Sequence, residues 1–222
     1  MTSRIVLKVG GAVAGEAATL ALVLAERHEV CVVHGAGPQI SAELERAGLE
    51  VRFVGGRRVT SREALAVVRA SFAAVNADVC GAIGPRAISL FGDEIGLEAV
   101  RVPELGHVGS PLPSSPPAVE DAIAAGLVPV VAPLAVGPLN VNADEAGAAL
   151  AVGLGADKLL FVTDVPGLLL GGVVASRIGV AEAERLLAAG VFGGGIVPKL
   201  EAAVTAARGG VDATIGATAV VA

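Results

Sequence analysis

The sequence predicts an α/β protein, a three-layer αβα sandwich with a mostly parallel central sheet. Short apolar runs alternate along the chain with stretches of helical periodicity. The apolar runs are continuous rather than alternating, which is typical of strands covered by helices on both faces. Most of them end in glycine, where a strand turns into a helix. With 222 residues the chain can bury a large core, and we expect a single domain.

The first half of the chain supplies strands and helices in alternation. The segment RIVLKVGG (4–11) predicts a strand ending in Gly-Gly, and EVCVVHGAG (29–37) predicts a second strand with a glycine end. Residues 38–48 begin with proline and end with glycine, the usual asymmetry of a helix. Residues 48–61 indicate an extended excursion or a hairpin. The other expected elements are helices at 17–28 and 62–84 and a strand at 86–93.

The second half continues the pattern. Residues 105–117 are expected to form a loop with a helix start behind it, and 127–133 a buried strand. A long apolar strand is expected at 157–167, and the last residues, VDATIGATAVVA, indicate one or two short strands. Helices are expected at 142–155, 180–190 and 198–210.

Composition narrows the class of protein. Hydrophobic residues make up 54% and charged residues 17%, which is typical of a globular chain, and with five Phe and no Trp or Tyr the core must be aliphatic. The net charge of −6 leaves no basic patch of the size that nucleic acid requires. Cys31 and Cys80 have no metal-binding spacing and are expected to be small hydrophobic residues in a reducing compartment.

A mean hydropathy of +0.73 raises the question of a membrane span. The longest uncharged run, residues 122–139, contains Pro129, Pro133 and Pro138, which would break a lipid-exposed helix. We interpret it as a helix end, a buried strand and a loop. No charged-then-apolar leader opens the chain, so we expect a cytoplasmic protein without a membrane partner.

Polar and glycine-rich segments follow four of the expected strands. They are Gly10-Gly11, Gly35 to Gly37, Asn140 to Asp144, and Asp164 to Gly167. In a parallel sheet the carboxyl ends of the strands share one edge, where ligands bind. These four segments are therefore expected to converge. Glycine turns let backbone N–H groups approach an anion, although neither KVGG nor HGAG matches a complete nucleotide-binding fingerprint.

Lysine is used sparingly. The chain has three lysines, Lys8, Lys158 and Lys199, and thirteen arginines, so a retained lysine indicates a place that needs a compact ammonium group. Lys8 lies beside Gly10-Gly11, and Lys199 follows GGGIVP at a helix start. An ordinary surface role would explain either one alone, but their shared glycine-rich setting favours a functional role for both. Lys158 is interpreted as structural.

The stretch GPLNVNADEAG (137–147) concentrates scarce amides beside a carboxylate. Asn142 can cap the following helix, and Asp144 can complement the helix dipole, but this leaves Asn140 unexplained. Alternatively, both Asn side chains face a small polar ligand while Asp144 accepts hydrogen bonds from the lysines. The two interpretations are compatible. Asn76, in a similar VNAD segment, is a weaker candidate for the same site.

Seven segments resemble, in order and spacing, the amino-acid kinase family, over nearly the whole chain. They are KVGG (8–11), HGAGPQI (34–40), GRRVT (56–60), LGHVG (105–109), NVNAD (140–144), TDVPG (163–167) and GGGIVPK (193–199). The pairing of GRRVT with NVNAD is similar to members that phosphorylate N-acetyl-L-glutamate, and differs from carbamate, uridylate and glutamate 5-kinases. The resemblance implies the carbamate kinase-like fold, with an acyl-amino-acid-binding lobe at about 1–138 and a nucleotide-binding lobe at about 139–222.

The resemblance also implies roles for particular residues. The γ-phosphoryl group of ATP, brought in with Mg²⁺, would pass to the side-chain carboxylate of N-acetyl-L-glutamate in arginine biosynthesis. Lys8 and Lys199 would stabilise that group from opposite sides, and Asp144 would orient both lysines. Arg58, rather than Arg57, would clamp the substrate α-carboxylate, and Asn140 would bind the N-acetylamide. The remaining implied substrate contacts are Gly10, Gly11, Gly35, Ala36, Gly37 and Asn142. The implied nucleotide wall is Asp164, Val165, Pro166, Gly167, Leu168, Leu169, Val191, Phe192 and Gly193. No protein metal ligand is implied.

Some features depart from the family pattern. Ala36 interrupts a turn that usually has three glycines, which is expected to alter its geometry slightly, because alanine tolerates positive φ poorly. Ile196 replaces a common methionine, a tolerable volume change. The closing segment is short, and no extra helix precedes the first strand, so we expect a homodimer that arginine does not inhibit. Strong inhibition in an arginine titration would contradict this expectation.

Two other functions stay open at this point. One is a sister kinase for aminoadipate or glutamate bound to a carrier protein, which the net charge of −6 disfavours because such a carrier is acidic. The other is a non-catalytic relative that binds nucleotides or amino acids, which would have no reason to keep Lys8, Lys199 and Asp144 together. His34 is expected to be a hydrogen-bonding residue at a strand end rather than an acid or base, and His107 to be structural or close to a substrate lid.

Overall fold

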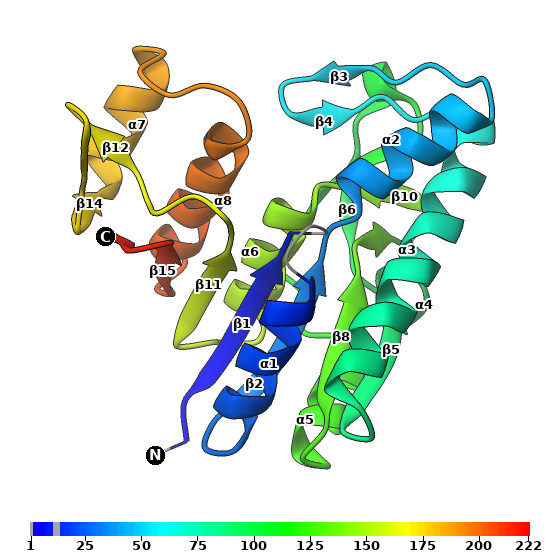
Figure 1. The fold of residues 1–222 in the computed structure, drawn as a ribbon, viewed down its shortest axis with the longest axis horizontal. Coiled ribbons are helices and arrows are strands. Elements are labelled where there is room, and N and C mark those ends of the chain that lie inside the picture. The colour runs from blue at the N-terminus through cyan, green and yellow to red at the C-terminus, as the bar shows by residue number, and fades with distance from the viewer. Residues whose placement is uncertain (1, 11–13) are drawn as a thin grey trace.

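The structure is a computed structural model that describes residues 2–10 and 14–222. The predicted substrate contact Gly11 lies outside the described residues. Within them, eight strands form one sheet in the order β14-β16-β15-β11-β1-β2-β8-β5 (Figure 1). Their bounds are β1 Arg4–Val9, β2 Glu29–His34, β5 Ala87–Phe91, β8 Val128–Ala132, β11 Lys158–Val162, β14 Arg177–Gly179, β15 Asp212–Ile215 and β16 Thr218–Val221.

The sheet is mostly parallel, as predicted. Strand β1 is central and pairs in parallel with β2 on one side and β11 on the other. The antiparallel step lies between β15 and β16, beyond which β14 runs parallel to β16. The carboxyl ends of β1, β2, β5, β8, β11 and β15 therefore share one edge of the sheet.

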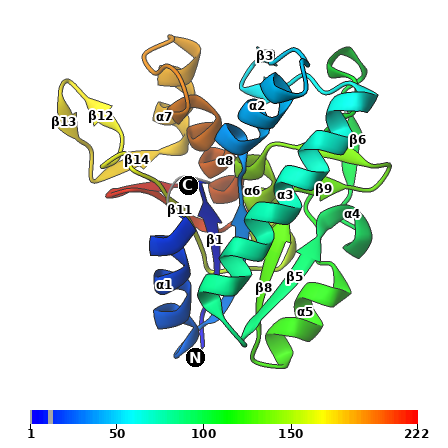
Figure 2. The same ribbon diagram turned by 45° about the vertical axis from the view of Figure 1, so that its right-hand side comes forward.

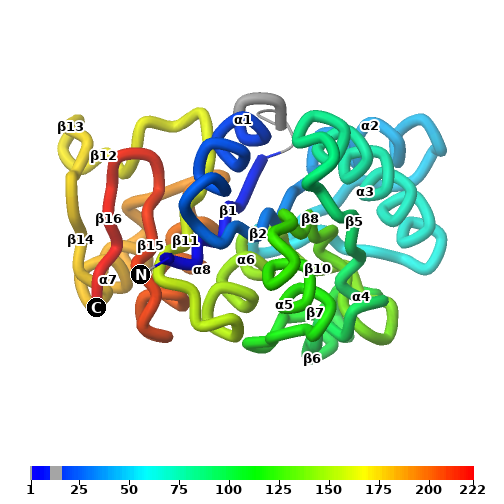
Figure 3. Tube along the Cα trace, turned by 90° about the horizontal axis from the view of Figure 1, so that it is seen from below, coloured from blue at the N-terminus to red at the C-terminus, as the bar shows by residue number. Residues whose placement is uncertain are grey.

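Helices cover both faces of the sheet and complete three layers, which Figure 3 shows from below. One layer contains α1 (Ala14–Ala25), α2 (Gly37–Arg46) and α3 (Arg62–Ile83). The other contains α5 (Pro117–Ala124), α6 (Ala143–Gly153) and α8 (Ile196–Arg208), with α7 (Val180–Ala188) packed on α8. In β1, the side chains of Ile5, Leu7 and Val9 join the first core, and Val6 joins the second. Strand alternation accounts for this division, and places Lys8 on the same face as Val6, toward α6.

Two smaller sheets and a hairpin lie beyond the carboxyl edge (Figure 2). Strands β3 (Phe53–Val54) and β4 (Arg57–Arg58) form the hairpin expected within 48–61. A four-stranded sheet has the order β6-β7-β10-β9, and β12 pairs with β13. The bounds of these and the remaining short elements are β6 Ala99–Arg101, β7 Val108–Pro111, β9 Leu134–Ala135, β10 Leu139–Val141, β12 Leu169–Leu170, β13 Val173–Val174, α4 Gly92–Ile95 and a 3₁₀ turn Pro103–Leu105.

The short elements correct parts of the sequence-based description. The expected loop at 105–117 contains β7, and the loop expected at the end of 122–139 contains β9. The strand expected at 157–167 ends already at Val162. Strand β7 pairs with β10, which is distant in sequence, whereas β9 is only two residues long and pairs with the nearby β10, so local periodicity carries little trace of either strand.

Helix α3 is, among the described residues, the one helix long and apolar enough to cross a membrane by length and composition. Its residues Val68, Phe72, Val75 and Val79 are buried against the sheet and its neighbouring helices. A core helix of a globular domain passes the same test, so this feature is weak evidence for a span.

Candidate active site

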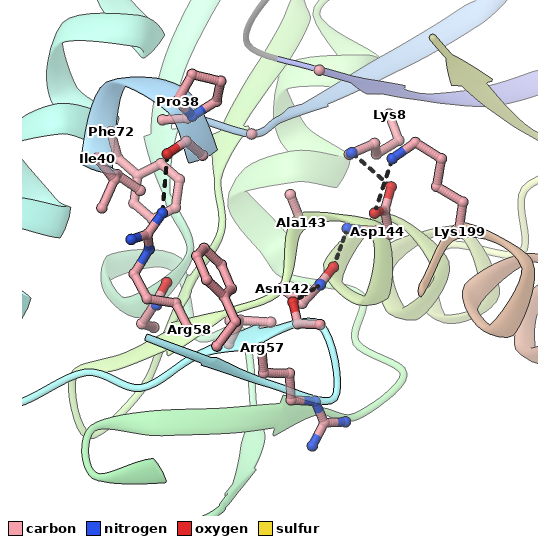
Figure 4. Close-up of a pocket in the computed structure, with 18 of the residues that line it drawn as sticks. Lys8, Pro38, Ile40, Arg57, Arg58, Phe72, Asn142, Ala143, Asp144 and Lys199 are labelled. Carbon is pink, nitrogen blue, oxygen red and sulfur yellow. Dashed lines mark hydrogen bonds and ion pairs between the residues drawn. The ribbon is translucent and has the colours of Figure 1, made fainter. Parts of the chain in front are cut away.

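Two lysines from opposite ends of the chain meet at one carboxylate (Figure 4). The Lys8 Nζ lies 2.6 Å from Asp144 Oδ1, and the Lys199 Nζ lies 3.4 Å from Asp144 Oδ2. The side chains of Lys8 and Asp144 are each 7% exposed, and that of Lys199 is 18% exposed. Both ammonium groups are thus held beside the same carboxylate, as the sequence predicted.

Burial sets the electrostatics of this group. It lowers the pKa of Lys8 below the ordinary lysine value, and the neighbouring Lys199 lowers it further, while Asp144 raises it. Asp144 is therefore the partner that keeps the buried ammonium of Lys8 charged. A charge pair in such surroundings is costly to break, because either partner alone would remain buried without compensation.

Local structure explains how Asp144 reaches both lysines. It lies in the first turn of α6, where a negative charge complements the helix dipole. Asn142 caps the helix, since its Oδ1 accepts from the backbone N–H groups of Asp144 at 2.8 Å and Glu145 at 3.3 Å. Gly147, one turn later, has no side chain between α6 and Lys8, and a Cβ there would lie 3.3 Å from the Lys8 Cβ.

A pocket of about 330 Å³ opens at this carboxyl edge of the sheet. Strand-end segments that the sequence predicted to converge do so here. The predicted site residues that line it are Lys8, Gly10, Gly35, Ala36, Gly37, Arg58, Asn140, Asn142, Asp144, Asp164 and Lys199.

Arg58 faces the pocket from β4. Its Nη2 donates to the Gly37 carbonyl oxygen at 3.0 Å and to Ser41 Oγ at 2.9 Å, and its guanidinium carbon lies 4.5 Å from the centre of the Phe53 ring. Its Nη1 is buried and has no hydrogen-bond partner among the described residues. Burial lowers the pKa of Arg58. The free donor is available to a carboxylate in the pocket.

Asn140 is held by a residue that the sequence analysis did not single out. Its Nδ2 donates to Thr60 Oγ1 at 3.0 Å, and the Thr60 hydroxyl donates to the Arg58 carbonyl oxygen at 2.9 Å. Thr60 is fully buried. The amide of Asn140 and the backbone of Arg58 are therefore fixed to each other through one hydroxyl group.

The glycine turns approach the pocket as expected, with one difference. Ala36 has φ −141° and precedes α2, which begins without a side-chain cap from any residue that the structure describes. Alanine therefore causes no left-handed strain here, and the start of α2 offers backbone N–H groups to an anion. The Gly35 N–H is already used, since it donates to the Val9 carbonyl oxygen at 2.8 Å.

The residues predicted to form the nucleotide wall differ in their exposure. Asp164 lines the pocket, whereas Leu168 is fully buried in the core and its backbone N–H donates to Thr218 Oγ1 at 2.9 Å. The side chain of Leu168 is thus not one that a nucleotide can touch. Val165 and Phe192 are half-buried, while Leu169 and Val191 are exposed. Pro166 and Gly193 are also exposed, and Gly167 is buried.

Other polar residues have structural roles. Asn76 does not line the pocket: its Nδ2 donates to the Val130 carbonyl oxygen at 2.9 Å and lies 3.1 Å from His34 Nε2. His34 ends β2 in this buried network, as expected for a strand-end residue. His107 connects the Thr60 segment to Asn140 through its backbone. Cys31 is buried, and Cys80 is half-buried.

Sequence reasoning missed several residues at the pocket. Phe53 and Phe72 line it, and Glu145 supports its rim through Arg57. The scarcity of aromatic residues was the one signal that could have found the first two, since two of five Phe lie here. Thr60 and Glu145 had no comparable signal.

Two ammonium groups and a guanidinium converging on one pocket suit an enzyme that handles anionic groups, and their placement at the carboxyl edge of a parallel sheet suits phosphoryl transfer. The model of the amino acid kinase family matches residues 3–216, and the chain belongs to that family. It is therefore a kinase by family.

Individual relatives agree with the family. The chain is 44% identical over 221 residues to an acetylglutamate kinase of Rubrobacter xylanophilus, covering 95% of this chain and 87% of the relative. Among solved structures, smu.665 of Streptococcus mutans has a TM-score of 0.90 at 26% identity and covers 100% of this chain and 99% of its own. The carbamate kinase of Giardia lamblia bound to AMP-PNP has a TM-score of 0.74 at 14% identity. The match covers 99% of this chain and 98% of the carbamate kinase chain, and it shows that the two share a fold.

Proposed function

We propose that this protein transfers the γ-phosphoryl group of ATP to the side-chain carboxylate of N-acetyl-L-glutamate. The product would be N-acetyl-L-glutamyl 5-phosphate, and the reaction would be the second step of arginine biosynthesis. The observation that carries the proposal is the sharing of Asp144 by Lys8 and Lys199 in the pocket that Arg58 enters. The 44% identity to an acetylglutamate kinase supports the choice of acceptor.

The chemistry needs charge neutralisation more than proton transfer. A carboxylate acceptor is ionised at neutral pH, so the reaction requires no general base. Two anions must instead approach in line, and the transferred group carries its charge on equatorial oxygens. Lys8 would neutralise this group from the acceptor side and Lys199 from the nucleotide side. Asp144 would hold both ammonium groups in place before the substrates arrive.

The acceptor would lie between Arg58 and the glycine turns. The free Nη1 of Arg58 would bind the α-carboxylate, and Asn140 would bind the N-acetylamide. Because Arg58 Nη2 already donates to Gly37 and Ser41, we propose that it is held in place for this contact. Backbone N–H groups of Gly10, Ala36 and Gly37 would cradle the transferring group.

ATP would enter from the side of Asp164, with Mg²⁺ held mainly by phosphate oxygens and water. Among the described residues, no three His, Cys, Asp or Glu side chains cluster as a protein-held metal would require. Bound Mg²⁺ would neutralise charge on the phosphates. We propose that residues at about 1–138 form the acceptor lobe and those at about 139–222 the nucleotide lobe, with the nucleotide wall formed by residues 164–167, 169 and 191–193 of the second.

Assembly and location are further parts of the proposal. We propose a homodimer in the cytoplasm, without a nucleic-acid or membrane partner. Light scattering on the purified chain tests the dimer, because a monomeric mass at working concentration would contradict it.

A coupled ADP-release assay tests the function. We expect turnover with N-acetyl-L-glutamate, and little with glutamate, aminoadipate or UMP. Preference for a carrier-bound aminoadipate or glutamate would instead favour the sister kinase. ATP binding without turnover of any acceptor would favour a non-catalytic relative. Either result would overturn the proposal.

A further inference from the structure

The consecutive residues Arg57 and Arg58 have different partners. Both residues line the pocket, but successive side chains of a strand point to opposite sides, so Arg58 extends toward Gly37 and Ser41 while the Arg57 guanidinium points away from the two lysines (Figure 4). Arg57 Nε donates to Glu145 Oε1 at 2.7 Å and Nη2 donates to Glu145 Oε2 at 2.9 Å. Nη2 also lies 3.2 Å from Ser110 Oγ, to which it donates.

Glu145 is the residue after Asp144. The first turn of α6 therefore holds the two lysines through one carboxylate and the β3–β4 hairpin through the next. The Arg57–Glu145 pair is bidentate, and its side chains are 29% and 21% exposed. A bidentate arginine–carboxylate pair fixes geometry as well as distance, which a single point contact does not.

The β3–β4 hairpin closes in a tight two-residue turn. Gly55 and Gly56 have φ values of +54° and +74°, as in a two-residue type I′ turn. The turn touches both helices that carry site residues. Asn142 Nδ2 donates to the Gly56 carbonyl oxygen at 3.4 Å, and a Cβ on Gly56 would lie 3.5 Å from Pro198, the residue before Lys199.

We infer that Arg57 and Glu145 are positioning residues, which fix the hairpin on α6 and thereby set the place of Arg58 relative to Asp144 and its lysines. Neither residue touches the reacting atoms. The ion pair acts through the backbone of β4. Arg57 and Arg58 are consecutive in this strand, so a shift of Arg57 also shifts Arg58. The part of this inference that concerns binding of the acceptor rests on the proposed function.

The kinetic test uses Arg57→Gln, Glu145→Gln and the double variant. We expect each single variant to raise KM for N-acetyl-L-glutamate about tenfold, while KM for ATP changes less than about twofold. The double variant should be no worse than either single one, because all three lose the same pair. Glu50→Gln is the matched control, since Glu50 lies 4.0 Å from Arg52 in an exposed pair near the same hairpin, and it should leave both KM values unchanged.

One pattern of kinetic results would overturn the inference. If Arg57→Gln weakened acceptor binding and Glu145→Gln did not, Arg57 would contact the acceptor itself. Additive effects in the double variant would likewise contradict a shared pair.

A second measurement does not depend on turnover. Hydrogen exchange by mass spectrometry should show faster exchange of the amides of residues 53–60 in both single variants, and unchanged exchange in Glu50→Gln. Wild-type exchange rates in Arg57→Gln and Glu145→Gln would overturn the inference. If the wild-type chain failed to phosphorylate N-acetyl-L-glutamate, the proposed function would fail, and the exchange result would still decide whether the ion pair fixes the hairpin.

Discussion

The ammonium group of Lys8 lies 2.6 Å from the carboxylate of Asp144 in surroundings where both side chains are almost wholly buried. The two residues come from adjacent layers, β1 of the sheet and α6 above it, and their side chains meet at the carboxyl edge. The charged side chains thus place a preorganised positive charge where a phosphoryl group can be stabilised without solvent rearrangement.

Replacing Lys8 by arginine should lower kcat by roughly 100-fold or more, because a longer, planar guanidinium cannot place its charge where the buried Lys8 Nζ lies, 2.6 Å from Asp144 Oδ1. The fold should persist, as judged by circular dichroism. Lys158→Arg is the control, since Lys158 is exposed at the start of β11, and its kcat should match the wild type. A kcat for Lys8→Arg within twofold of the wild type would remove Lys8 from the mechanism.

The pH dependence of kcat should reveal the coupling between Lys8 and Asp144. The pKa of Lys8 is lowered by burial, so its ammonium form, which we propose is the active one, is lost as pH rises through a value below that of ordinary lysine. Asp144 opposes this shift. Asp144→Asn should therefore move the alkaline limb of the pH–kcat profile to lower pH. This shift is separate from the lower maximal kcat that the variant should also show.

The control for that profile is Asp121→Asn, which removes an exposed carboxylate from α5. Its alkaline limb should coincide with that of the wild type. A limb in Asp144→Asn that stayed in place or moved to higher pH would mean that Lys8 is not the group that titrates.

The parts of this molecule that could be predicted are those with a strong local signal. Continuous apolar runs gave β1, β2, β8 and β11, and the scarcity of lysine pointed to Lys8 and Lys199. Both kinds of signal arise because a parallel strand must be apolar on each face and because a buried ammonium group is costly to keep.

The parts that were missed depend on contacts between distant segments. Strands β6 and β7, AVR and VGSP, are too short to show a period, and β7 also pairs with β10, which lies much later in the chain. The resemblance favoured Arg58 over Arg57 as the substrate clamp and assigned no role to Arg57, whose partner Glu145 is distant in sequence. Glu145 and Thr60 carry no signal of their own in the sequence, because the partner of Glu145 is Arg57 in the hairpin and the partner of Thr60 is Asn140 in β10.

Gly147→Ala should separate catalysis from stability. A Cβ at this position would lie 3.3 Å from the Lys8 Cβ and 3.5 Å from its Cγ, so Lys8 must shift by a few tenths of an ångström. Alanine favours a helix over glycine by about 1 kcal/mol, which offsets the crowding. We expect kcat to fall about tenfold while the midpoint of thermal unfolding hardly changes.

The control for Gly147→Ala is Gly81→Ala in α3. No heavy atom of the described part of the chain lies within 4 Å of a Cβ at Gly81, so this variant gains helix stability and should keep full activity. Equal activity of the two variants would show that the close approach of α6 to Lys8 does not matter for the reaction.

His34 should make the folded state sensitive to mild acid. Burial lowers its pKa to about 4, from an ordinary value of 6.5. The amide of Asn76 is oriented by the Val130 carbonyl oxygen, which its Nδ2 approaches at 2.9 Å, so it donates to His34 Nε2 and requires the neutral imidazole. The stability that depends on neutral His34 is therefore complete above pH 6.5 and is lost as pH falls from 6.5 toward 4, by about 3 kcal/mol in all.

Urea unfolding at pH 7.0 and pH 5.0 measures this loss of stability against His34→Gln, which lacks the titrating imidazole. Carboxylates contribute to the acid limb of both proteins, so the informative quantity is the difference between their two changes in unfolding free energy. We expect the wild type to lose more than the variant, and His28→Gln, which leaves the buried network intact, to behave as the wild type. Equal losses in the wild type and His34→Gln would show that His34 does not titrate in this range, because no other group distinguishes the two chains.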